Sequence, residues 1–311
     1  MLTFKAANLT QSSIVNAQFI GPKQSVGLLE VPNGIPLNTG ELIVDRCIFT
    51  GTQINTYSTL FDPSGTNPIP SLVVQNSTIT DSMVSNGGLN SDPQLIKLLS
   101  NQLQNVIINA TAHYNGMRMS NCGGGNVSIY WRGYTKAYFE INDTKLTNVS
   151  VNFTPFYGVE TFFTIRRSTL LNATIHLTGP SYDTTVNHLD IICSKLTVPG
   201  QIEMATGSIL NSTITSSGNQ TNTTGVFAGA ISIVNSSIFA FDVGVSIFAY
   251  KDPMGIINNS NFYKNSDVNA TGNWWGTKND ISDTLYDYWK NINYGEIFYN
   301  NFAQSRIEQQ C

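Results

Sequence analysis

Apolar and polar residues follow a short motif that recurs along most of the chain. Each copy has two apolar residues separated by one position, then a polar turn rich in Asn and Ser, and then a final apolar residue. The final apolar residues are Ile14, Ile48, Ile79, Leu103, Ile129, Leu146, Leu170, Leu196, Ile214, Ile238 and Phe262. They are 17 to 34 residues apart, and a repeat of this length with one supersecondary unit per copy is typical of a solenoid.

A second pattern predicts a sharp bend inside several copies. In Leu146–Val151 and Leu170–Ile175, an apolar residue recurs five positions after the first, and Asn stands two positions after the first. Alternation of period two combined with a five-residue step indicates short strands joined by tight corners. The sequence therefore predicts an all-β fold in which strands of successive coils pair in parallel, about 4.8 Å apart. About 11 coils would occupy residues 1–267, with apolar columns inside and ladders of Ser, Thr and Asn outside.

One run of the chain is compatible with either a helix or a strand. Residues 94–103 could form a short helix that has Asp92 as its N-cap and Pro93 at its first position. The same run also fits the repeat, and we favour a strand there.

Residues 268–311 depart from the repeat and predict a C-terminal cap. Large aromatic residues concentrate there, namely Trp274, Trp275, Tyr286 and Trp289. A short helix that starts near Ser282 would carry two of them across the last coil. The first repeat begins by Ala7 without a comparable cap, and an open sheet end needs a partner. We expect that partner to be preceding sequence, another domain or a second copy of the chain, stacked end to end.

The polar turns and the closing segment Asn273–Gly276, which reads Asn-Trp-Trp-Gly, together resemble a known family. They look like right-handed parallel β-helix repeat proteins of the pectin-lyase-like superfamily, in particular large extracellular or cell-surface proteins with similar endings. The resemblance covers nearly the whole chain as a repeat, and the closing segment is its most specific part. It implies a right-handed parallel β-helix but no activity, because enzymes, adhesins and filament scaffolds share this fold.

The motifs that the resemblance associates with polysaccharide cleavage are absent from the chain. Asn-Thr-Asp, Asp-Asp, Gly-His-Gly and Arg-Ile-Lys of polygalacturonase-like hydrolases do not occur, and neither does the Trp-Ile-Asp-His motif of pectin lyases. Glycoside hydrolysis needs two carboxyl groups that flank one bond. The nearest candidates are Glu140 with Asp143, and Asp183 with Asp190 near His188, Arg166 and Arg167. We interpret them as solvated turn residues and predict no catalytic residue.

A group of aromatic residues offers a second type of candidate site. Arg132, Tyr134, Tyr138, Phe156 and Tyr157 could line a groove for sugar. Packing within the core and the ladders is the interpretation that we favour.

The composition excludes one class of partner and favours one compartment. Only 12% of residues are charged and the net charge is −4, so no basic stripe is present to bind nucleic acid. Asn-X-Ser/Thr sequons occur more often than the composition predicts, and they indicate N-glycosylation. The predicted sites are Asn8, Asn76, Asn109, Asn126, Asn142, Asn148, Asn172, Asn211, Asn219, Asn222, Asn235, Asn258 and Asn269. Asn152 is left out because Pro155 follows its Thr, and the alternative is that Asn-Ser-Thr turns create sequons as a by-product.

Targeting segments are not evident in the sequence. No run reaches the roughly 20 apolar residues of a membrane span, and the first residues pass directly into a repeat without a signal peptide. Since the sequons indicate a secreted protein, we expect the chain to be a mature or partial piece of a longer precursor.

The histidines and glycines do not indicate a cofactor site. His113, His176 and His188 lack metal-ligand spacing, and no Cys-X-X-Cys occurs. Gly123–Gly125 precedes a strand rather than a helix, so it is not a phosphate-binding loop. We expect no cofactor and no metal.

The four cysteines test the stacking order of the coils. Cys47, Cys122 and Cys193 belong to well-separated coils, and a disulfide needs Cα atoms within about 7 Å. We therefore predict that Cys47 and Cys193 are unpaired and largely buried. Cys311, near the end of the chain, is free to pair elsewhere.

These observations favour a non-enzymatic, N-glycosylated, extracellular β-helix protein that acts as a structural or adhesive surface element. End-to-end stacking on itself or on a neighbouring domain could build a filament or a larger stalk. The alternatives are a polysaccharide lyase or glycoside hydrolase and a lectin-like carbohydrate-binding module. The expected partner is the chain itself or a neighbouring domain, and glycans are the alternative partner. We expect neither nucleic acid nor a membrane span.

Overall fold

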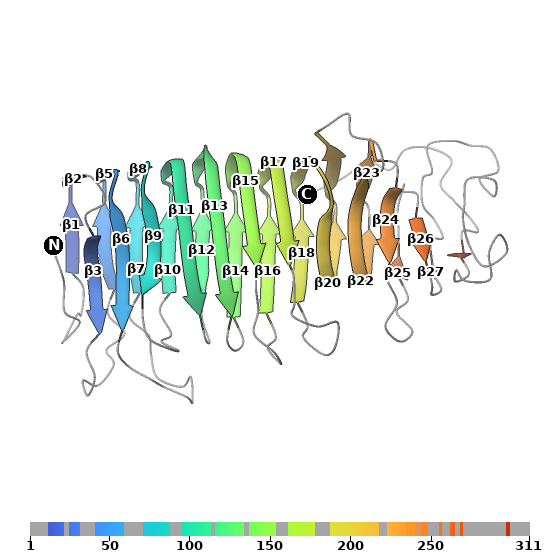
Figure 1. Cartoon of the computed structure of the whole chain (residues 1–311), viewed down its shortest axis with the longest axis horizontal. Coiled ribbons are helices and arrows are strands. Elements are labelled where there is room, and N and C mark those ends of the chain that lie inside the picture. Colours follow the sequence, from blue (N-terminus) through green and yellow to red (C-terminus); the bar gives the residue numbers. More distant parts are fainter. Residues whose placement is uncertain are drawn as a thin grey trace.

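The protein forms a solenoid of parallel β-strands (Figure 1). The computed structural model describes residues 12–21, 25–31, 41–58, 71–87, 95–112, 116–133, 137–153, 161–177, 187–217, 223–234, 236–241, 243–247, 255–256, 262–264, 268–269 and 297–298. Within these ranges 28 strands form one coiled sheet, and none of these residues is helical. The predicted all-β, parallel solenoid is therefore confirmed. The described part of the chain accordingly contains no helix that is long and apolar enough to cross a membrane.

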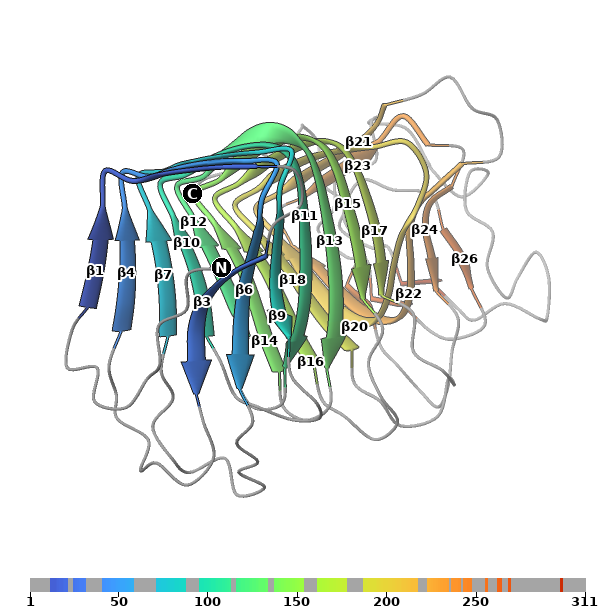
Figure 2. The same cartoon turned by 60° about the vertical axis from the view of Figure 1, so that its left-hand side comes forward.

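The strands stack in three parallel ladders that run along the molecule, and the chain visits them in turn (Figures 1 and 2). The first ladder contains β1 (Ser12–Val15), β4 (Glu41–Asp45), β7 (Ser71–Gln75), β10 (Leu95–Leu99), β12 (Met117–Ser120), β14 (Ala137–Asn142), β16 (Thr161–Arg166), β18 (Asn187–Ile192), the second parts of β20 (Ile202–Leu210) and β22 (Thr224–Val234), β25 (Gly255–Ile256), β27 (Val268–Asn269) and β28 (Ile297–Phe298). The second contains β2 (Gln18–Ile20), β5 (Ile48–Thr50), β8 (Thr78–Thr80), the first parts of β11 (Gln102–Ala112), β13 (Gly123–Gly133), β15 (Lys145–Phe153) and β17 (Thr169–Leu177), β19 (Lys195–Val198), β21 (Thr213–Ser216) and β23 (Ser237–Phe239). The third contains β3 (Ser25–Val31), β6 (Gln53–Ser58), β9 (Met83–Gly87), the second parts of β11, β13, β15 and β17, the first parts of β20 and β22, β24 (Val243–Ile247) and β26 (Phe262–Lys264).

The number of coils differs from the predicted 11. Thirteen strands follow one another in the first ladder of the described residues, and the last two, β27 and β28, belong to the segment assigned to the cap. The run after Asp92, which was compatible with a helix, forms the strands β10 and β11. The predicted cap residues Trp274, Trp275, Tyr286 and Trp289 lie outside the described residues, as does Ala7.

Apolar side chains stack in columns inside the solenoid. Ile214 pairs in register with Ile238, and both are almost fully buried, as the repeat predicts. Ile79, Leu103, Leu146, Leu170 and Leu196 occupy the same column of the second ladder. Because strand residues alternate between the two faces, each inward apolar position repeats one coil later in register.

Four residues that the motif predicts for this column do not occupy it. Ile48 is 40% exposed and its neighbour Phe49 faces inward, because the alternation of the strand is displaced by one residue from the motif. The other three belong to other ladders: Ile14 pairs with Val44 in the first, Ile129 with Ile108 in the third, and Phe262 with Val245 in the third.

The column position expected for Ile129 is held by Gly124. Gly124 is in register with Leu103 and Leu146, and an apolar motif cannot identify a glycine.

An aromatic cluster fills the middle of the core. Trp131, Phe139, Phe153 and Phe163 are each no more than 1% exposed. The ring of Phe139 lies 4.9 Å from that of Phe163 and 5.5 Å from that of Trp131, between ring centroids. These side chains come from the first and third ladders, so they join opposite walls of the solenoid.

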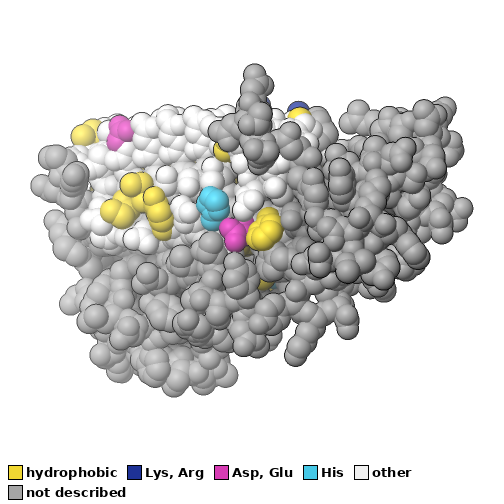
Figure 3. All heavy atoms as spheres, turned by 45° about the vertical axis from the view of Figure 1, so that its right-hand side comes forward, with side chains coloured by type: hydrophobic (Ala, Val, Ile, Leu, Met, Phe, Trp, Pro, Cys, Tyr) yellow, Lys and Arg dark blue, Asp and Glu magenta, His cyan; other side chains and the backbone are white. Residues whose placement is uncertain are grey.

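The outer surface is mostly uncharged. Figure 3 shows one side of the molecule, on which only a few of the described side chains are acidic, basic or histidine. Between the second and third ladders, one exposed polar side chain per coil forms a series, which we call the asparagine ladder. It begins with the carboxylate of Asp81 and continues with the amides of Asn105, Asn126, Asn148 and Asn172. Each asparagine Nδ2 donates to the Oδ1 of the preceding member, over 2.8 to 3.0 Å. Side-chain hydrogen bonds therefore connect the coils on this edge.

The corner between the first and second ladders explains the Asn-Ser turns of the sequence. One residue per coil has a left-handed backbone there, with φ from 47° to 58°: Asn16, Arg46, Asn76, Ser100, Asn121, Asp143, Arg167, Cys193 and Asn211. Asparagine is enriched in this region of φ.

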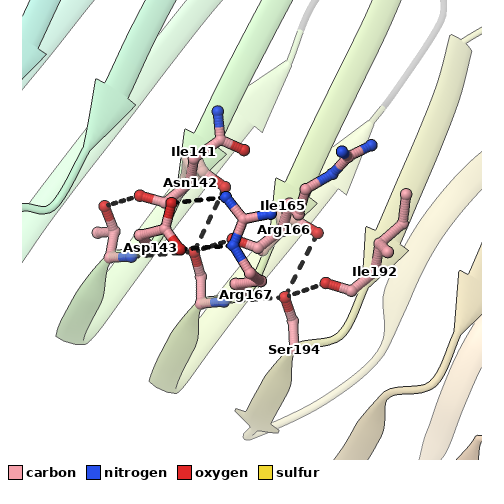
Figure 4. Close-up of polar contacts among 10 residues, drawn as sticks. Ile141, Asn142, Asp143, Ile165, Arg166, Arg167, Ile192 and Ser194 are labelled. Atoms are coloured by element: carbon pink, nitrogen blue, oxygen red, sulfur yellow. Dashed lines mark hydrogen bonds and ion pairs between the residues drawn. The ribbon is translucent and has the colours of Figure 1, made fainter. Parts of the chain in front are cut away.

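Two corners of successive coils are joined by an ion pair. The exposed side chains of Arg167 and Asp143 form a bidentate pair with N–O distances of 2.6 and 2.7 Å (Figure 4).

The next residue of each corner turns inward and forms a buried polar series, which we call the inner polar ladder. Its members are Ser77, Asn101, Thr144, Ser168, Ser194, Ser212 and Ser236, all at most 5% exposed. The side-chain oxygen of each accepts the backbone N–H of the equivalent residue one coil earlier, over 2.9 to 3.3 Å. Ser194 also donates to the carbonyl groups of Ile192 and Ile165 (Figure 4). The N–H groups at the sharp corner thus donate to side-chain oxygens of the next coil.

We expect Ser194→Ala to lower the free energy of unfolding by about 1–3 kcal/mol, because the buried N–H of Ser168 loses its acceptor. The free energy would be measured by urea denaturation followed by circular dichroism. Lys195→Ala, which changes the adjacent exposed residue, is the control and should have little effect. Equal stability of the two variants would contradict a stabilising role for the inner polar ladder.

The cysteines occupy two different corner positions. Cys47 and Cys122 take inward positions of the inner polar ladder and are free thiols, which confirms the prediction for Cys47. Burial raises the pKa of Cys122 to about 11. The prediction for Cys193 is wrong, because Cys193 is disulfide-bonded and only half-buried. Cys193 stands at the left-handed corner position, whose side chain points outward, whereas Ser194 takes the inward position.

Candidate functional site

The outer face of the first ladder brings together the richest set of functional groups among the described residues. Along β14, β16, β18 and β20, the residues Tyr138, Phe162, His188 and Thr206 are in register in successive coils. Their neighbours in sequence, such as Phe139 and Phe163, face the core. We call this outward series the aromatic row.

The aromatic row presents stacked rings to solvent. The rings of Tyr138 and Phe162 are nearly parallel, with centroids 5.2 Å apart and an interplanar angle of 12°. The imidazole of His188 lies 5.9 Å from the ring of Phe162. Tyr138 is 44% exposed and stacks on Phe162, so it packs in an outer ladder and not in the core. The row as a whole is a partly exposed apolar surface.

A second series, two residues further along each strand, carries the charged groups. Glu140, Thr164, Asp190 and Ser208 are in register in successive coils. The Nε2 atom of His188 lies 3.0 Å from Oδ1 of Asp190, and its Nδ1 atom lies 3.2 Å from the hydroxyl of Thr206. The hydroxyl of Ser208 donates to the same Oδ1 atom of Asp190. The structure therefore confirms that Asp190 and His188 lie together.

Both members of this pair have perturbed ionisation. The hydrogen bond to Asp190 raises the pKa of His188, although partial burial opposes the change. Partial burial also opposes ionisation of Asp190, but hydrogen bonds from His188 and Ser208 outweigh it and lower its pKa. The pair is thus held as imidazolium and carboxylate over a wider range of pH than the free side chains.

The arrangement of these groups differs from a nucleophilic triad. Ser208 bonds to the carboxylate of Asp190, whereas a serine nucleophile requires a bond to the imidazole that takes its proton. Glycoside hydrolysis needs a carboxyl group that remains protonated as the general acid, and the lowered pKa of Asp190 does not suit that role. Glu140 pairs with Arg118 of the preceding coil, at 3.2 Å between Oε2 and Nε.

Other candidates from the sequence do not join this cluster. Asp143 and Arg167 pair with each other at the exposed corner instead. The side chain of Arg166 is exposed, and Arg166 is in register with Ile192 of the next coil, not with Asp190 or His188. Asp183, Tyr134, Phe156 and Tyr157 lie outside the described residues, and the side chain of Arg132 is not described. Phe162 and Ser208 were not predicted as site residues, because only the structure shows their register with Tyr138 and Asp190.

The sequon asparagines fall into distinct structural classes. Asn126, Asn148 and Asn172 are exposed members of the asparagine ladder. Asn76 and Asn211 stand at left-handed corners, and Asn109 and Asn142 lie within strands. The described residues do not include Asn8, Asn219, Asn222, Asn235 or Asn258, and the side chain of Asn269 in β27 is not described.

The His188–Asp190 pair should make the stability of the chain depend on pH. Because the folded-state pKa of His188 is raised, its contribution to stability is complete below the unfolded pKa and is lost as pH rises through the folded pKa. The contribution of Asp190, whose pKa is lowered, is lost instead as pH falls below its ordinary range. A proton NMR titration of the His188 ring should therefore give a higher midpoint in the native chain than in Asp190→Asn. An unchanged midpoint would contradict the assigned cause.

In the described ranges, no group of three or more His, Cys, Asp and Glu side chains gathers in a way that could hold a metal ion. Comparison with known proteins adds no assignment: no protein-family model, no curated protein and no solved structure matches the chain. What the structure establishes is a parallel β-helix repeat protein.

Proposed function

We propose that this chain is a non-enzymatic, N-glycosylated, extracellular β-helix protein of the pectin-lyase-like kind, which serves as a structural or adhesive surface element. The observation that carries the proposal is that the carboxylates of Asp190 and Glu140 in the first ladder are engaged by other side chains. Asp190 accepts hydrogen bonds from His188 on its own strand and from Ser208 of the next coil, and Glu140 pairs with Arg118 of the preceding coil. The contacts of Ser208 and Arg118 link coil to coil, as the asparagine ladder and the inner polar ladder do.

Two features support an extracellular location. Cys193 is disulfide-bonded, and disulfides persist mainly in oxidising compartments. The surface has few charges and many Asn-X-Ser/Thr sequons, so attached glycans would supply the solubility that ionised groups supply elsewhere.

A cleavage assay tests the non-enzymatic assignment. The purified full chain would be incubated with a panel of neutral and acidic polysaccharides, and new chain ends would be quantified. We expect no cleavage above the rate without protein. Cleavage that is lost in Asp190→Asn but retained in Asp143→Asn would instead identify a polysaccharide lyase or glycoside hydrolase.

A second candidate is a lectin-like module, favoured by the aromatic row. Tyr138 and Phe162 present an exposed stacked surface beside the ionised Asp190, and sugars bind proteins through ring faces combined with polar groups. Binding on a glycan array that disappears in Tyr138→Ser and persists in Ile48→Ser would support this candidate. Ile48 is the control because its side chain is similarly exposed but lies in the second ladder.

End-to-end assembly with a second copy is a further part of the proposal. Ile14 and Phe19 face the core in the first described coil but are only half-buried, whereas Val44 and Phe49 in the next coil are fully buried. Ile20, in the same coil, is 73% exposed. A coil from a second copy that stacks on β1 and β2 would cover these side chains.

Sedimentation of the full chain tests this assembly. We expect association that increases with concentration and is lost in Ile20→Lys. Ile107→Lys, at another exposed apolar residue far from this end, should associate as the native chain does. A native chain that remains monomeric at all concentrations would contradict assembly.

A further inference from the structure

The asparagine ladder places three sequons in three successive coils. Asn126, Asn148 and Asn172 have left-handed backbones with φ of 52° to 55° and point out of the same edge. The Nδ2 of Asn148 donates to Asn126, and that of Asn172 donates to Asn148, over 2.9 and 3.0 Å. These are the Nδ2 atoms to which an N-linked glycan would be attached.

The coil spacing limits how many of these asparagines can carry a glycan. Strands of neighbouring coils are about 4.8 Å apart, which is comparable with the width of a single sugar ring. A branched oligosaccharide is considerably wider than one ring, so oligosaccharides on two neighbouring coils of this ladder would overlap. A glycan on one member is sterically compatible with the fold, but glycans on two adjacent members are not.

Asn109 has a different environment. It is exposed on the outer face of β11 in the third ladder, and its side chain forms no hydrogen bond with the described residues. Its register partners in the adjacent coils are Ser85 and Tyr130, neither of which is a sequon asparagine. A glycan at Asn109 therefore has no competing glycan at the equivalent position of either adjacent coil, because Asn126 of the next coil stands at the corner and not in register with Asn109.

Apolar side chains surround Asn109. Tyr130 is 47% exposed and lies beside Asn109 in the next coil, and Ile107, two residues earlier on β11, is 44% exposed on the same face. Exposed apolar patches mark interaction sites, and the C–H face of a sugar ring packs well on an aromatic ring. The first sugar attached to Asn109 would cover this patch.

We propose that Asn109 is the main glycan-bearing asparagine of the described residues, with Tyr130 and Ile107 as the platform for the first sugar, and that no two adjacent members of Asn126, Asn148 and Asn172 are glycosylated in one molecule. This inference rests on the proposed extracellular, glycosylated function. The donor is a lipid-linked oligosaccharide pyrophosphate. A bond forms between Nδ2 of Asn109 and the anomeric carbon of the sugar, the bond from that carbon to the pyrophosphate oxygen breaks, and one Nδ2 hydrogen leaves as a proton while the lipid pyrophosphate departs.

Site-resolved mass spectrometry tests the proposal on the full chain secreted from a eukaryotic cell. Enzymatic release of glycans in ¹⁸O-water marks each occupied asparagine as labelled aspartate, and intact glycopeptides report double occupancy of a peptide that contains Asn126 and Asn148, or Asn148 and Asn172. Thr111→Ala removes the sequon of Asn109 without changing Asn109, and Thr111→Ser retains it as the matched control. The fluorescence of a dye that binds apolar surfaces would then be compared between the two variants. It would also be compared for the native protein before and after deglycosylation.

We expect Asn109 to have the highest occupancy of the described sites, and no doubly glycosylated peptide from the asparagine ladder. Loss of the Asn109 glycan, by Thr111→Ala or by enzyme, should increase dye fluorescence, and the increase should be smaller when Tyr130→Ser is also present. Glycans at other sequons with Asn109 unmodified, or on two adjacent ladder members, would overturn this inference but leave the proposed function standing. A chain without any glycan would overturn both.

Discussion

Phe163→Ala is expected to lower the free energy of unfolding by about 3–5 kcal/mol, the usual loss when a large buried aromatic side chain is removed. Phe163 is 1% exposed, and its ring packs against Phe139 at 4.9 Å and Phe153 at 6.2 Å between centroids. Because Phe139 and Phe163 lie in the first ladder and Phe153 in the third, the cavity would separate two walls of the solenoid. The surrounding strands are joined by backbone hydrogen bonds on both sides and cannot collapse into the space.

The adjacent residue provides a matched control for this experiment. Phe162 has the same side chain but points outward in the aromatic row, where it is only half-buried. Phe162→Ala should therefore cost much less than Phe163→Ala. Urea denaturation followed by circular dichroism gives the free energies, and hydrogen exchange would show whether β14–β18 open before the rest, as coupled repeats allow. Equal losses for the two variants would contradict the assigned inward and outward directions.

Gly124→Ala is expected to prevent correct stacking of β13, with a loss greater than the roughly 1–3 kcal/mol of backbone strain alone. Gly124 has a φ of 134°, and a Cβ atom there would lie 1.7 Å from the carbonyl oxygen of Leu103. That oxygen belongs to the backbone of the preceding coil, so relief of the clash requires the two strands to separate. Because β15 stacks on β13 and β17 stacks on β15, the disturbance extends along the ladder.

Gly123 offers a control one residue away. A Cβ atom at Gly123 would meet only the end of the Gln102 side chain, at 3.1 Å, and this flexible side chain can move aside. Gly123→Ala should therefore give a folded chain with near-native stability, while Gly124→Ala should give a low soluble yield or an early unfolding transition. The measurement is the soluble yield together with the denaturation midpoint. Native stability in Gly124→Ala would contradict the close approach of Gly124 to the carbonyl oxygen of Leu103.

The repeat was predictable because its positions have strict physical requirements. A left-handed corner favours Asn, and the buried corner N–H needs a small polar acceptor such as Ser in the next coil. The pair Asn211–Ser212 satisfies both requirements, and the apolar residue two positions later, Ile214, is buried as predicted. Where other residues meet the same requirements, the motif predicts the wrong position. Arg46 and Cys47 occupy these two corner positions, so the motif points to Ile48, although Phe49 is the buried residue.

The candidate site was predicted only in part. Asp190 and His188 are two residues apart on one strand, so alternation alone places them on the same face. Phe162 and Ser208 come from neighbouring coils, 26 and 18 residues from His188 and Asp190 respectively. The loop lengths between coils vary, so their register could not be counted along the chain. For the same reason Cys193 was assigned to the interior, although it belongs to the corner position one residue before Ser194.

The sequence by itself determined the class of fold, since a short repeat of alternating apolar residues and Asn-Ser turns can bury its apolar side chains only by stacking on copies of itself. Only the tertiary structure decided which side chains of different coils lie side by side, because that depends on the register of each strand pair. It joined His188 to Phe162 and Thr206, placed three sequon asparagines in one hydrogen-bonded ladder, and set Asn109 beside Tyr130. The physical reason is that parallel strands exchange hydrogen bonds at fixed intervals, while the loops that connect them differ in length from coil to coil.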